Sequence, residues 1–473
     1  MFKKMDQIAP ATLLEFAAQS LVSNEAAAIH ALEELPRDLF VPLFIAAFLG
    51  GHKKILKAMV RIWPFRCLHI GALSVREPYY EIWKAMIDGL QILCAISSFP
   101  YRGPKLRILD LRQDADCRTT CCEIRTMFPF CFQSCVFSQH SILRLQEAQQ
   151  SVTHIRNVTS DSEPQSSWES MELLVDLSLD GTLKTRQFLS FLRRKIEQSF
   201  GSLHLCCRDL QIDKISDYKS ILKFLDLVCI DHLGVDQAYL SEVTSLLDQM
   251  VHLDSLSLSK IPFKSCKGKN FRNFLTNLRR MDNLQELSLS FFCLTNQLHK
   301  LLRVLPPQLD ALHLSFCGLS SRDFTVLSQS SQATHLRLLN LSNNQISWEV
   351  SESFQILLEK LSGTLRHLEI NSCLMTDSTL SVVIPALSRC SHLRVLSFAS
   401  NPITMPMLMN LLQQLTGLME LKHVIYSIPV HCYEQWQFNG SLDQQKLVEV
   451  QAELKAMLQA VHRNDMHWAT CPE

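Results

Sequence analysis

Residues 336–346 read LRLLNLSNNQI, and the architecture of the chain can be worked out from this stretch. It follows the template L-x-x-L-x-L-x-x-N/C-x-L, in which Leu339 and Leu341 lie on one face of a short strand because alternate strand residues share a face. Asn344 falls where the chain turns away from the strand, and its amide can satisfy backbone groups of that turn. Each copy of this template therefore predicts one strand followed by one turn.

The template recurs through the second half of the chain. Complete copies lie at 309–319, 365–375 and 393–403. From Leu253 onward the copies start 31, 25, 27, 29 and 28 residues apart, close to the period of leucine-rich repeats. Less complete copies contain Leu284, Leu287 and Leu289; Leu253, Leu256 and Leu258; Leu222, Leu225 and Leu227; Leu203, Leu205 and Leu210; and Leu106, Leu109 and Leu111.

Helical patterns such as 353–361 and 379–387 lie between the strands, and one repeat alone cannot bury their apolar faces. We therefore predict an α/β leucine-rich-repeat solenoid, a horseshoe with parallel strands on the concave face, helices outside and an N-terminal helical cap. The predicted organisation is a helical segment at 1–50, the solenoid at 51–440 and a capping helix (444–461) with a tail at 441–473. A Ser-rich stretch at about 147–170 is predicted to be an insertion.

Composition limits the function. The 473 residues contain 46 basic and 46 acidic side chains, and this balance argues against direct nucleic-acid binding. The 77 leucines and only 13 glycines leave little material for phosphate-binding loops, and no P-loop, G-x-G-x-x-G, H-E-x-x-H or G-x-S-x-G motif occurs. We expect neither an enzyme nor a cofactor.

The compartment follows from the cysteines and the apolar runs. Seventeen cysteines without a signal-like N-terminus indicate reduced thiols in the cytoplasm, the nucleus or both. The longest apolar run, 39–49, is too short to span a membrane, so we expect no membrane segment.

Two apolar stripes precede the repeats. Leu13, Ala17 and Leu21 form the first, and Leu35, Leu39 and Leu43 form the second after the break at Pro36. Each stripe either caps the solenoid or docks on a partner, and the spacing alone leaves both interpretations open.

The residue types add a resemblance to two docking motifs. Thr12, Leu13, Ala17 and Leu21 resemble the BC box that binds elongin C, which is helix-in-groove recognition. The second motif resembles the cullin-2 box, aliphatic-Pro-x-x-aliphatic-x-x-x-aliphatic, and consists of Leu35, Pro36, Leu39 and Leu43.

Longer stretches resemble the PRAME family (preferentially expressed antigen in melanoma, including the oogenesins). They are LEELPRDLFVPLFIAAFLGGHKKILKAMVRIWPFRCLHIGAL at 32–73, KLRILDLR at 105–112, LHLCCRDLQI at 203–212, LRVLSFASNPIT at 393–404 and DMHWATCPE at 465–473. The resemblance covers essentially the whole chain. It implies a leucine-rich-repeat fold and a substrate-recognition subunit of an elongin–cullin-2 ubiquitin ligase, with elongin C/B and cullin-2 as partners and a protein substrate. It also implies proteasomal degradation of targets and effects on proliferation, apoptosis and transcription, including repression of retinoic acid signalling, in germ-line cells.

Two alternatives remain: a transcriptional corepressor or scaffold of the retinoic-acid-receptor type, and an enzyme inhibitor. The L-x-x-L-L segments at 298–302 and 408–412 match nuclear-receptor ligands, but we expect them to be repeat core. Six residues could form a zinc site, although aromatic neighbours favour packing: Cys117, Cys121, Cys122, Cys131, Cys135 and His140. Substrate contacts are expected on the concave face at His313, Arg337, Arg366, His367 and Arg394.

Overall fold

The computed structural model describes residues 12–70, 73, 80–96, 105–112, 171–199, 201–215, 219–433 and 441–470. The chain folds into two compact units. Unit 1 comprises Met1–Leu210 with Tyr218–Cys229, and unit 2 comprises Gln211–Asp217 with Ile230–Glu473. The domain boundaries predicted at 1–50, 51–440 and 441–473 remain predictions.

Helices dominate the start of unit 1. Helix α3 is apolar around most of its circumference, so it lies in the core with Phe40, Phe44 and Phe48 buried. The helical run continues to Arg61, beyond the expected limit at 50, because α4 also has an apolar stripe. The helices and 3₁₀ turns of unit 1 are α1 (Leu13–Val22), α2 (Glu25–Ala31), η1 (Arg37–Leu39), α3 (Phe40–Leu49), α4 (Lys53–Arg61), α5 (Tyr80–Ile96), α8 (Leu183–Gln198), α9 (Lys219–Leu222) and η4 (Leu227–Cys229).

A four-stranded parallel sheet completes unit 1, in the order β1-β2-β3-β5. Its strands are β1 (Cys67–His69), β2 (Ile108–Asp110), β3 (Met171–Leu174) and β5 (Leu203–Cys206). Leu109, Leu173 and Leu205 are paired neighbours across it and are buried. Two further short strands are β4 (Leu177–Leu179) and β6 (Asp209–Ile212), and β6 runs across the division between the units.

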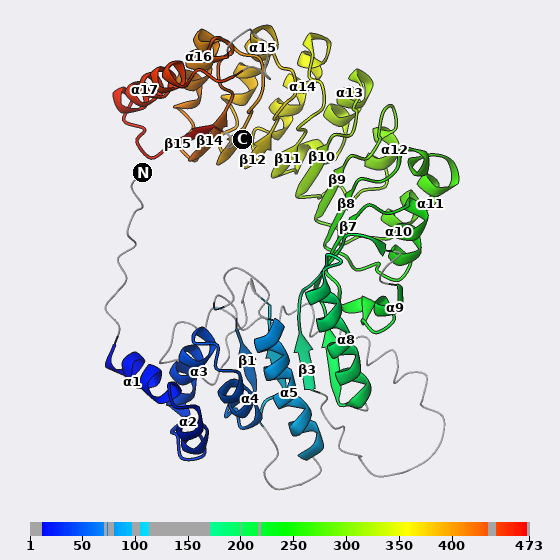
Figure 1. The fold of residues 1–473 in the computed structure, drawn as a ribbon. Coiled ribbons are helices and arrows are strands. Elements are labelled where there is room, and N and C mark those ends of the chain that lie inside the picture. The colour runs from blue at the N-terminus through cyan, green and yellow to red at the C-terminus, as the bar shows by residue number, and fades with distance from the viewer. Residues whose placement is uncertain are drawn as a thin grey trace. The chain divides into compact units, whose positions relative to one another are not determined.

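Unit 2 is the repeat array. Its strands stand in chain order from β7 to β15, each hydrogen-bonded to the next, and they pair in parallel. In Figure 1 they form the inner face of a curved array, and the helices stand on its outer side. The strands are β7 (His232–Asp236), β8 (Ser255–Ser259), β9 (Glu286–Ser290), β10 (Ala311–Ser315), β11 (Leu338–Asn340), β12 (His367–Glu369), β13 (Val395–Ser397), β14 (His423–Tyr426) and β15 (His467–Thr470).

Each outer helix has an apolar side that is buried. In α16 the Thr404 side chain caps the N-terminus, and the helix buries Leu408, Leu411, Leu412 and Leu415 at spacings of three, one and three residues. The helices and 3₁₀ turns of unit 2 are α10 (Leu240–Leu247), η5 (Phe263–Cys266), α11 (Gly268–Leu278), α12 (Leu298–Leu302), α13 (Ser321–Gln329), η6 (Gln332–Thr334), α14 (Trp348–Leu361), α15 (Asp377–Leu387), α16 (Met405–Leu415), η7 (Val430–Cys432) and α17 (Gln444–Ala460).

The strand leucines fill the space between sheet and helices. Leu312, Leu339, Leu368 and Leu396 are paired in register on successive strands, and each is 0% exposed. The predicted leucine-rich-repeat fold class is therefore confirmed, with the template leucines as its core.

As predicted, the side chain at the N/C position of the template hydrogen-bonds to backbone groups of the turns. The Asn401 amide donates to the carbonyls of Ile370 (2.9 Å) and Phe398 (2.8 Å) and accepts from the amides of Cys373 (3.0 Å) and Met375 (3.1 Å). Where cysteine takes the slot, the thiol of Cys373 makes a weaker bond to the carbonyl of Leu341, at 3.4 Å.

One prediction from the pattern was wrong. Leu222, Leu225 and Leu227 do not form a repeat strand: α9 and η4 occupy this segment, and the strand is β7, one turn later. In the tail after the predicted capping helix, β15 pairs with β14. The predicted helix at 444–461 is confirmed as α17, and the stretch at about 147–170 lies outside the described residues.

Candidate functional site

The first candidate surface is helix α1. Thr12 begins it as an N-cap: its hydroxyl accepts from the Glu15 amide at 3.3 Å, and the Glu15 carboxylate accepts from the Thr12 amide at 2.7 Å. This capping box satisfies two backbone donors that a helix start otherwise leaves free. Thr12 therefore has a structural role in holding the helix that carries Leu13.

The packing of α1 differs from the predicted stripe. The helix packs on α3 through Ala18 and Val22, which are 7% and 3% exposed. Leu13 and Ala17 are exposed and Leu21 is half-buried, so the stripe of Leu13, Ala17 and Leu21 is not the face through which α1 packs on α3. The buried residues Ala18 and Val22 each come one residue after Ala17 and Leu21. One residue along an α-helix turns the side chain by about 100°, which is enough to change the face that is buried.

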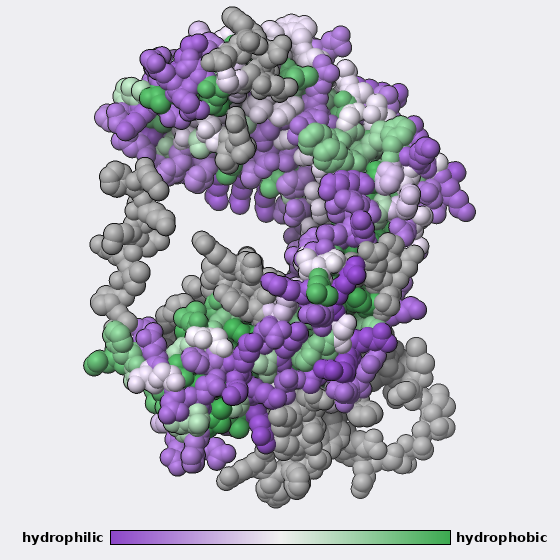
Figure 2. Space-filling view, in the orientation of Figure 1, coloured by the Kyte–Doolittle hydropathy of each residue, from purple (hydrophilic) through white to green (hydrophobic). Residues whose placement is uncertain are grey.

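The outer face of α1 is apolar. Leu13 is 90% exposed, Phe16 57% and Leu14 37%, and together they form what we call the α1 patch. In Figure 2 a hydrophobic area lies over α1, at the start of the described chain. Clusters of exposed apolar side chains on a capped helix are typical of helix-in-groove binding.

The second motif begins the next helices. Pro36 (φ −55°) begins the turn η1 and is exposed, whereas Leu35 and Leu39 are half-buried. Leu43, which the cullin-box pattern includes among the docking residues, is 3% exposed because α3 buries it in the unit 1 core. A direct contact of Leu43 with a partner is corrected to a packing role, and Leu35, Pro36 and Leu39 remain accessible.

The concave face of unit 2 holds the predicted substrate residues on neighbouring repeats. His313 on β10 lies 3.4 Å from the Glu286 carboxylate of β9, which is long for a hydrogen bond and is better described as an ion pair. On β12, His367 contacts Glu369 at 2.8 Å. The neighbouring histidine lowers the pKa of each carboxylate and is the largest cause of the shift in each case.

The three predicted arginines form a row at the N-terminal ends of the strands. The Arg366 amide donates to the Arg337 carbonyl at 2.7 Å, and the Arg394 amide donates to the Arg366 carbonyl at 2.8 Å, which places the three arginines on consecutive repeats. Arg337 pairs with Asp310 at 3.2 Å and Arg394 with Glu420 at 3.0 Å. Arg366 is exposed and has no ion pair among the described residues, so it is the open cation of the row.

One feature escaped the sequence analysis. Phe291 and Phe316 follow β9 and β10 and stack with ring centroids 4.1 Å apart, although they are 48% and 44% exposed. Both have positive φ (50° and 54°), a region that bulky residues rarely adopt. The repeated Ser-Phe pair, at Ser290–Phe291 and Ser315–Phe316, is the signal that could have revealed it.

Three further groups of residues concern nuclear-receptor binding and metal binding. The leucines of both L-x-x-L-L segments are buried in α12 and α16, as predicted for repeat core. The cysteines and histidine at 117–140 lie outside the described residues. Within the described part, one group has the spacing of metal ligands, and it consists of His204, Asp226 and Cys229.

None of the described helices combines the length and apolarity that a membrane crossing needs.

Comparison with known proteins adds the family. The PRAME N-terminal domain matches residues 10–117, and the PRAME C-terminal domain matches residues 171–473. Neither domain, nor the relatives that match, indicates an enzyme family. A solved structure from Bacteroides fragilis covers 60% of this chain and 82% of that chain, but its 12% identity and TM-score of 0.28 are too low to inform the fold.

Relatives that align with nearly the whole chain include members of the same family. The bovine (Bos taurus) leucine-rich repeat-containing protein 14 is 31% identical, and the match covers 97% of each chain. PRAME family member 12 of Homo sapiens is 32% identical, with 95% of this chain and 90% of that relative covered. Since the domain matches span most of the chain and the relatives align over nearly their whole length, the chain belongs to the PRAME family.

Proposed function

We propose that the chain is the substrate-recognition subunit of an elongin–cullin-2 RING ubiquitin ligase. The observation that carries this proposal is the α1 patch: a helix with the residue types of a BC box turns Leu13, Leu14 and Phe16 to solvent. A helix that only capped the fold would bury these side chains. The family membership is consistent with this role.

Docking would proceed through α1 first. Leu13 would enter a pocket on elongin C, and the exposed, small Ala17 would allow the two helices to approach closely. Burial of one leucine side chain contributes about 2 kcal/mol, and a central anchor contributes about 2–4 kcal/mol in many interfaces. The accessible Leu35, Pro36 and Leu39 would then contact cullin-2.

The substrate would bind unit 2. The strands carry the cations Arg337, Arg366 and Arg394 at their N-terminal ends, and the stacked Phe291–Phe316 pair follows β9 and β10. In Figure 2 hydrophilic side chains line the inner side of the curved strand array. Aromatic and arginine side chains are the residue types that dominate binding energy in protein interfaces. Targets held there would be ubiquitinated by the ligase and degraded by the proteasome.

The decisive experiment is co-purification of the full chain with the elongin B–elongin C complex. We expect the wild type to form a stable complex and Leu13→Ser to bind at least ~30-fold more weakly, which is about 2 kcal/mol. Leu49→Ser is the matched control, because Leu49 lies in the same unit and is 70% exposed but is outside both motifs. It should bind like the wild type.

The outcome also separates the alternatives. If the folded wild type fails to bind elongin B–elongin C, the ligase role is wrong, and the corepressor or scaffold role becomes the better account. Equal binding by Leu13→Ser and Leu49→Ser would show that the α1 patch is not the elongin contact.

Charge reversal tests the concave face. We expect Arg366→Glu to remove most acidic partners from the set of proteins labelled by proximity in proteasome-inhibited cells, because it places a negative charge at the open cation of the row. Elongin binding should not change, since Arg366 lies in unit 2 and α1 in unit 1. Lys455→Glu, a reversal on α17 away from the strands, is the control; an identical loss there would exclude a specific role for Arg366.

A further inference from the structure

Two short segments of unit 1 carry four side chains of the types that bind metals. On strand β5, His204 and Cys206 are two residues apart and lie on the same face, the half-buried one, whereas Leu203 and Leu205 are buried on the other. In the 3₁₀ turn region of η4, Asp226 and Cys229 are three residues apart and share one side, because side chains at i and i+3 eclipse in this geometry.

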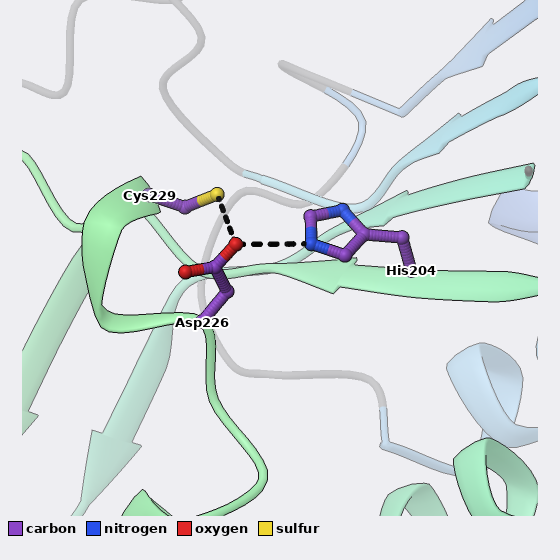
Figure 3. A group of neighbouring side chains, drawn as sticks. All are labelled: His204, Asp226 and Cys229. Atoms are coloured by element: carbon purple, nitrogen blue, oxygen red, sulfur yellow. Dashed lines mark hydrogen bonds and ion pairs between the residues drawn. The ribbon is translucent and has the colours of Figure 1, made fainter. Parts of the chain in front are cut away.

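Backbone and side-chain bonds fix the turn. The Cys229 amide donates to the Asp226 carbonyl at 3.1 Å, and one oxygen of the Asp226 carboxylate accepts from the Val228 amide at 3.1 Å. The other oxygen, Oδ2, is thereby directed toward β5, where Figure 3 shows it between the His204 ring and the Cys229 sulfur. The turn thus presents one carboxylate oxygen and one thiol to the strand.

The distances agree with a tetrahedral metal site. His204 Nε2 lies 3.3 Å from Asp226 Oδ2, and Cys229 Sγ lies 3.6 Å from the same oxygen. Zinc bonds of about 2.05 Å to nitrogen, 2.1 Å to oxygen and 2.3 Å to sulfur place such ligands about 3.4 Å (N–O) and 3.6 Å (S–O) apart. The three ligand atoms all lie within 4.8 Å of one another.

Cys206 is the fourth candidate ligand, because it lies on the same half-buried face of β5 as His204. Its sulfur does not belong to the group whose ligand atoms all lie within 4.8 Å of one another, so this side chain would have to change its rotamer to bind the ion. The surroundings are of mixed charge, since Glu172 and Arg208 lie near His204 and Cys206.

We propose that His204, Cys206, Asp226 and Cys229 form a structural Zn²⁺ site. Soft thiolates together with imidazole select zinc over calcium and magnesium, which prefer oxygen ligands. Four protein ligands leave no position for a reacting water, so the site is structural rather than catalytic. The ion would fasten the η4 turn to β5, the last strand in the order of its sheet. This inference does not depend on the ligase role.

The test measures metal in the purified full chain. We expect about one tightly bound zinc per chain, and a cobalt-substituted sample with the absorption of a tetrahedral ion carrying two thiolate ligands. His204→Ala and Cys229→Ser should each weaken zinc binding at least ~10-fold. Cys206→Ser should halve the thiolate-to-cobalt absorption. Cys293→Ser, a half-buried cysteine of unit 2, is the control and should match the wild type.

Loss of folding is distinguished by thermal unfolding. Zinc should raise the melting temperature of the wild type and of Cys293→Ser, because a ligand that binds only the folded state stabilises it. It should raise those of His204→Ala and Cys229→Ser less, with each variant compared with its own zinc-free sample. Zinc far below one per chain, or unchanged binding in both variants, overturns the site. Unchanged cobalt absorption in Cys206→Ser overturns the fourth ligand, and a Cys206–Cys229 disulfide in the reduced preparation overturns both thiolate assignments.

Discussion

Replacing Asp110 by asparagine is expected to destabilise unit 1 by about 3–5 kcal/mol, the range found when one partner of a buried ion pair is removed. Asp110 is 1% exposed and forms two hydrogen bonds with the Arg112 guanidinium, both at 2.8 Å. The same carboxylate contacts His69 at 3.0 Å. Asparagine keeps the volume but leaves the Arg112 charge, 6% exposed, without its counter-ion.

The pH dependence of this effect has a defined sign. Burial by itself raises the pKa of Asp110, but hydrogen bonds from Arg112 and His69 lower it from 3.8 to about 2. A carboxyl whose pKa is lower in the folded state stabilises the fold above its unfolded pKa and loses that contribution as the pH falls through the folded value. The lowered pKa corresponds to about 2 kcal/mol, present above pH ~4 and lost between pH ~4 and ~2.

Denaturant unfolding followed by hydrogen exchange in the α4 and β2 peptides measures this prediction within unit 1. Glu34→Gln is the control: it removes an exposed negative charge from the same unit and should change the free energy of unfolding by less than about 0.5 kcal/mol. A difference between wild type and Asp110→Asn that stays constant from pH 6 to pH ~2.5 would contradict the role of the charge.

Replacing Asn401 by alanine is expected to destabilise unit 2 by about 3 kcal/mol. The side chain is 0% exposed and bonds backbone groups of two consecutive repeats, including the carbonyls of Ile370 and Phe398. Each buried polar group left without a partner contributes about 1–3 kcal/mol, and water that enters the vacated space offsets part of the total.

Hydrogen exchange should show the loss in the turn after β12, where the Cys373 and Met375 amides donate to Asn401. The matched control is Asn410→Ala, the same substitution at an exposed position on α16. If both variants unfold at the same denaturant concentration, the asparagine network does not stabilise the repeats as we describe.

Much of unit 2 follows from the sequence because its contacts are local and periodic. The leucines of the template mark β8 to β13, and the N/C slot marks the turns, since each strand pairs with the strand of the next repeat. The pattern failed at Leu222, Leu225 and Leu227, where leucines at nearly the right spacing lie in a short helix and a 3₁₀ turn. Spacing over six residues cannot distinguish these structures when no second repeat supports it.

The sequence identified the residues of the candidate surfaces but not their exposure. The motif residues Thr12 and Leu13 and the arginines of the concave face were identified by type and spacing, but burial was not. The sequence could not show that α1 buries Ala18 and Val22 rather than Ala17 and Leu21, or that Leu43 belongs to the core. The Phe291–Phe316 stack was missed because its residues are 25 apart and meet only through strand pairing.

Periodicity and residue types at fixed spacing were thus enough to define the repeat class, its leucine core and its asparagine turns, and longer stretches of sequence carried the resemblance to the PRAME family. The folded structure was needed to show which residues of α1 face solvent, that Asp110 and Arg112 form a buried pair with His69, and that His204 meets Asp226 and Cys229. The cause is the same in each case. Exposure and non-local contacts depend on packing against segments far along the chain, and local patterns of apolar and polar residues do not encode them.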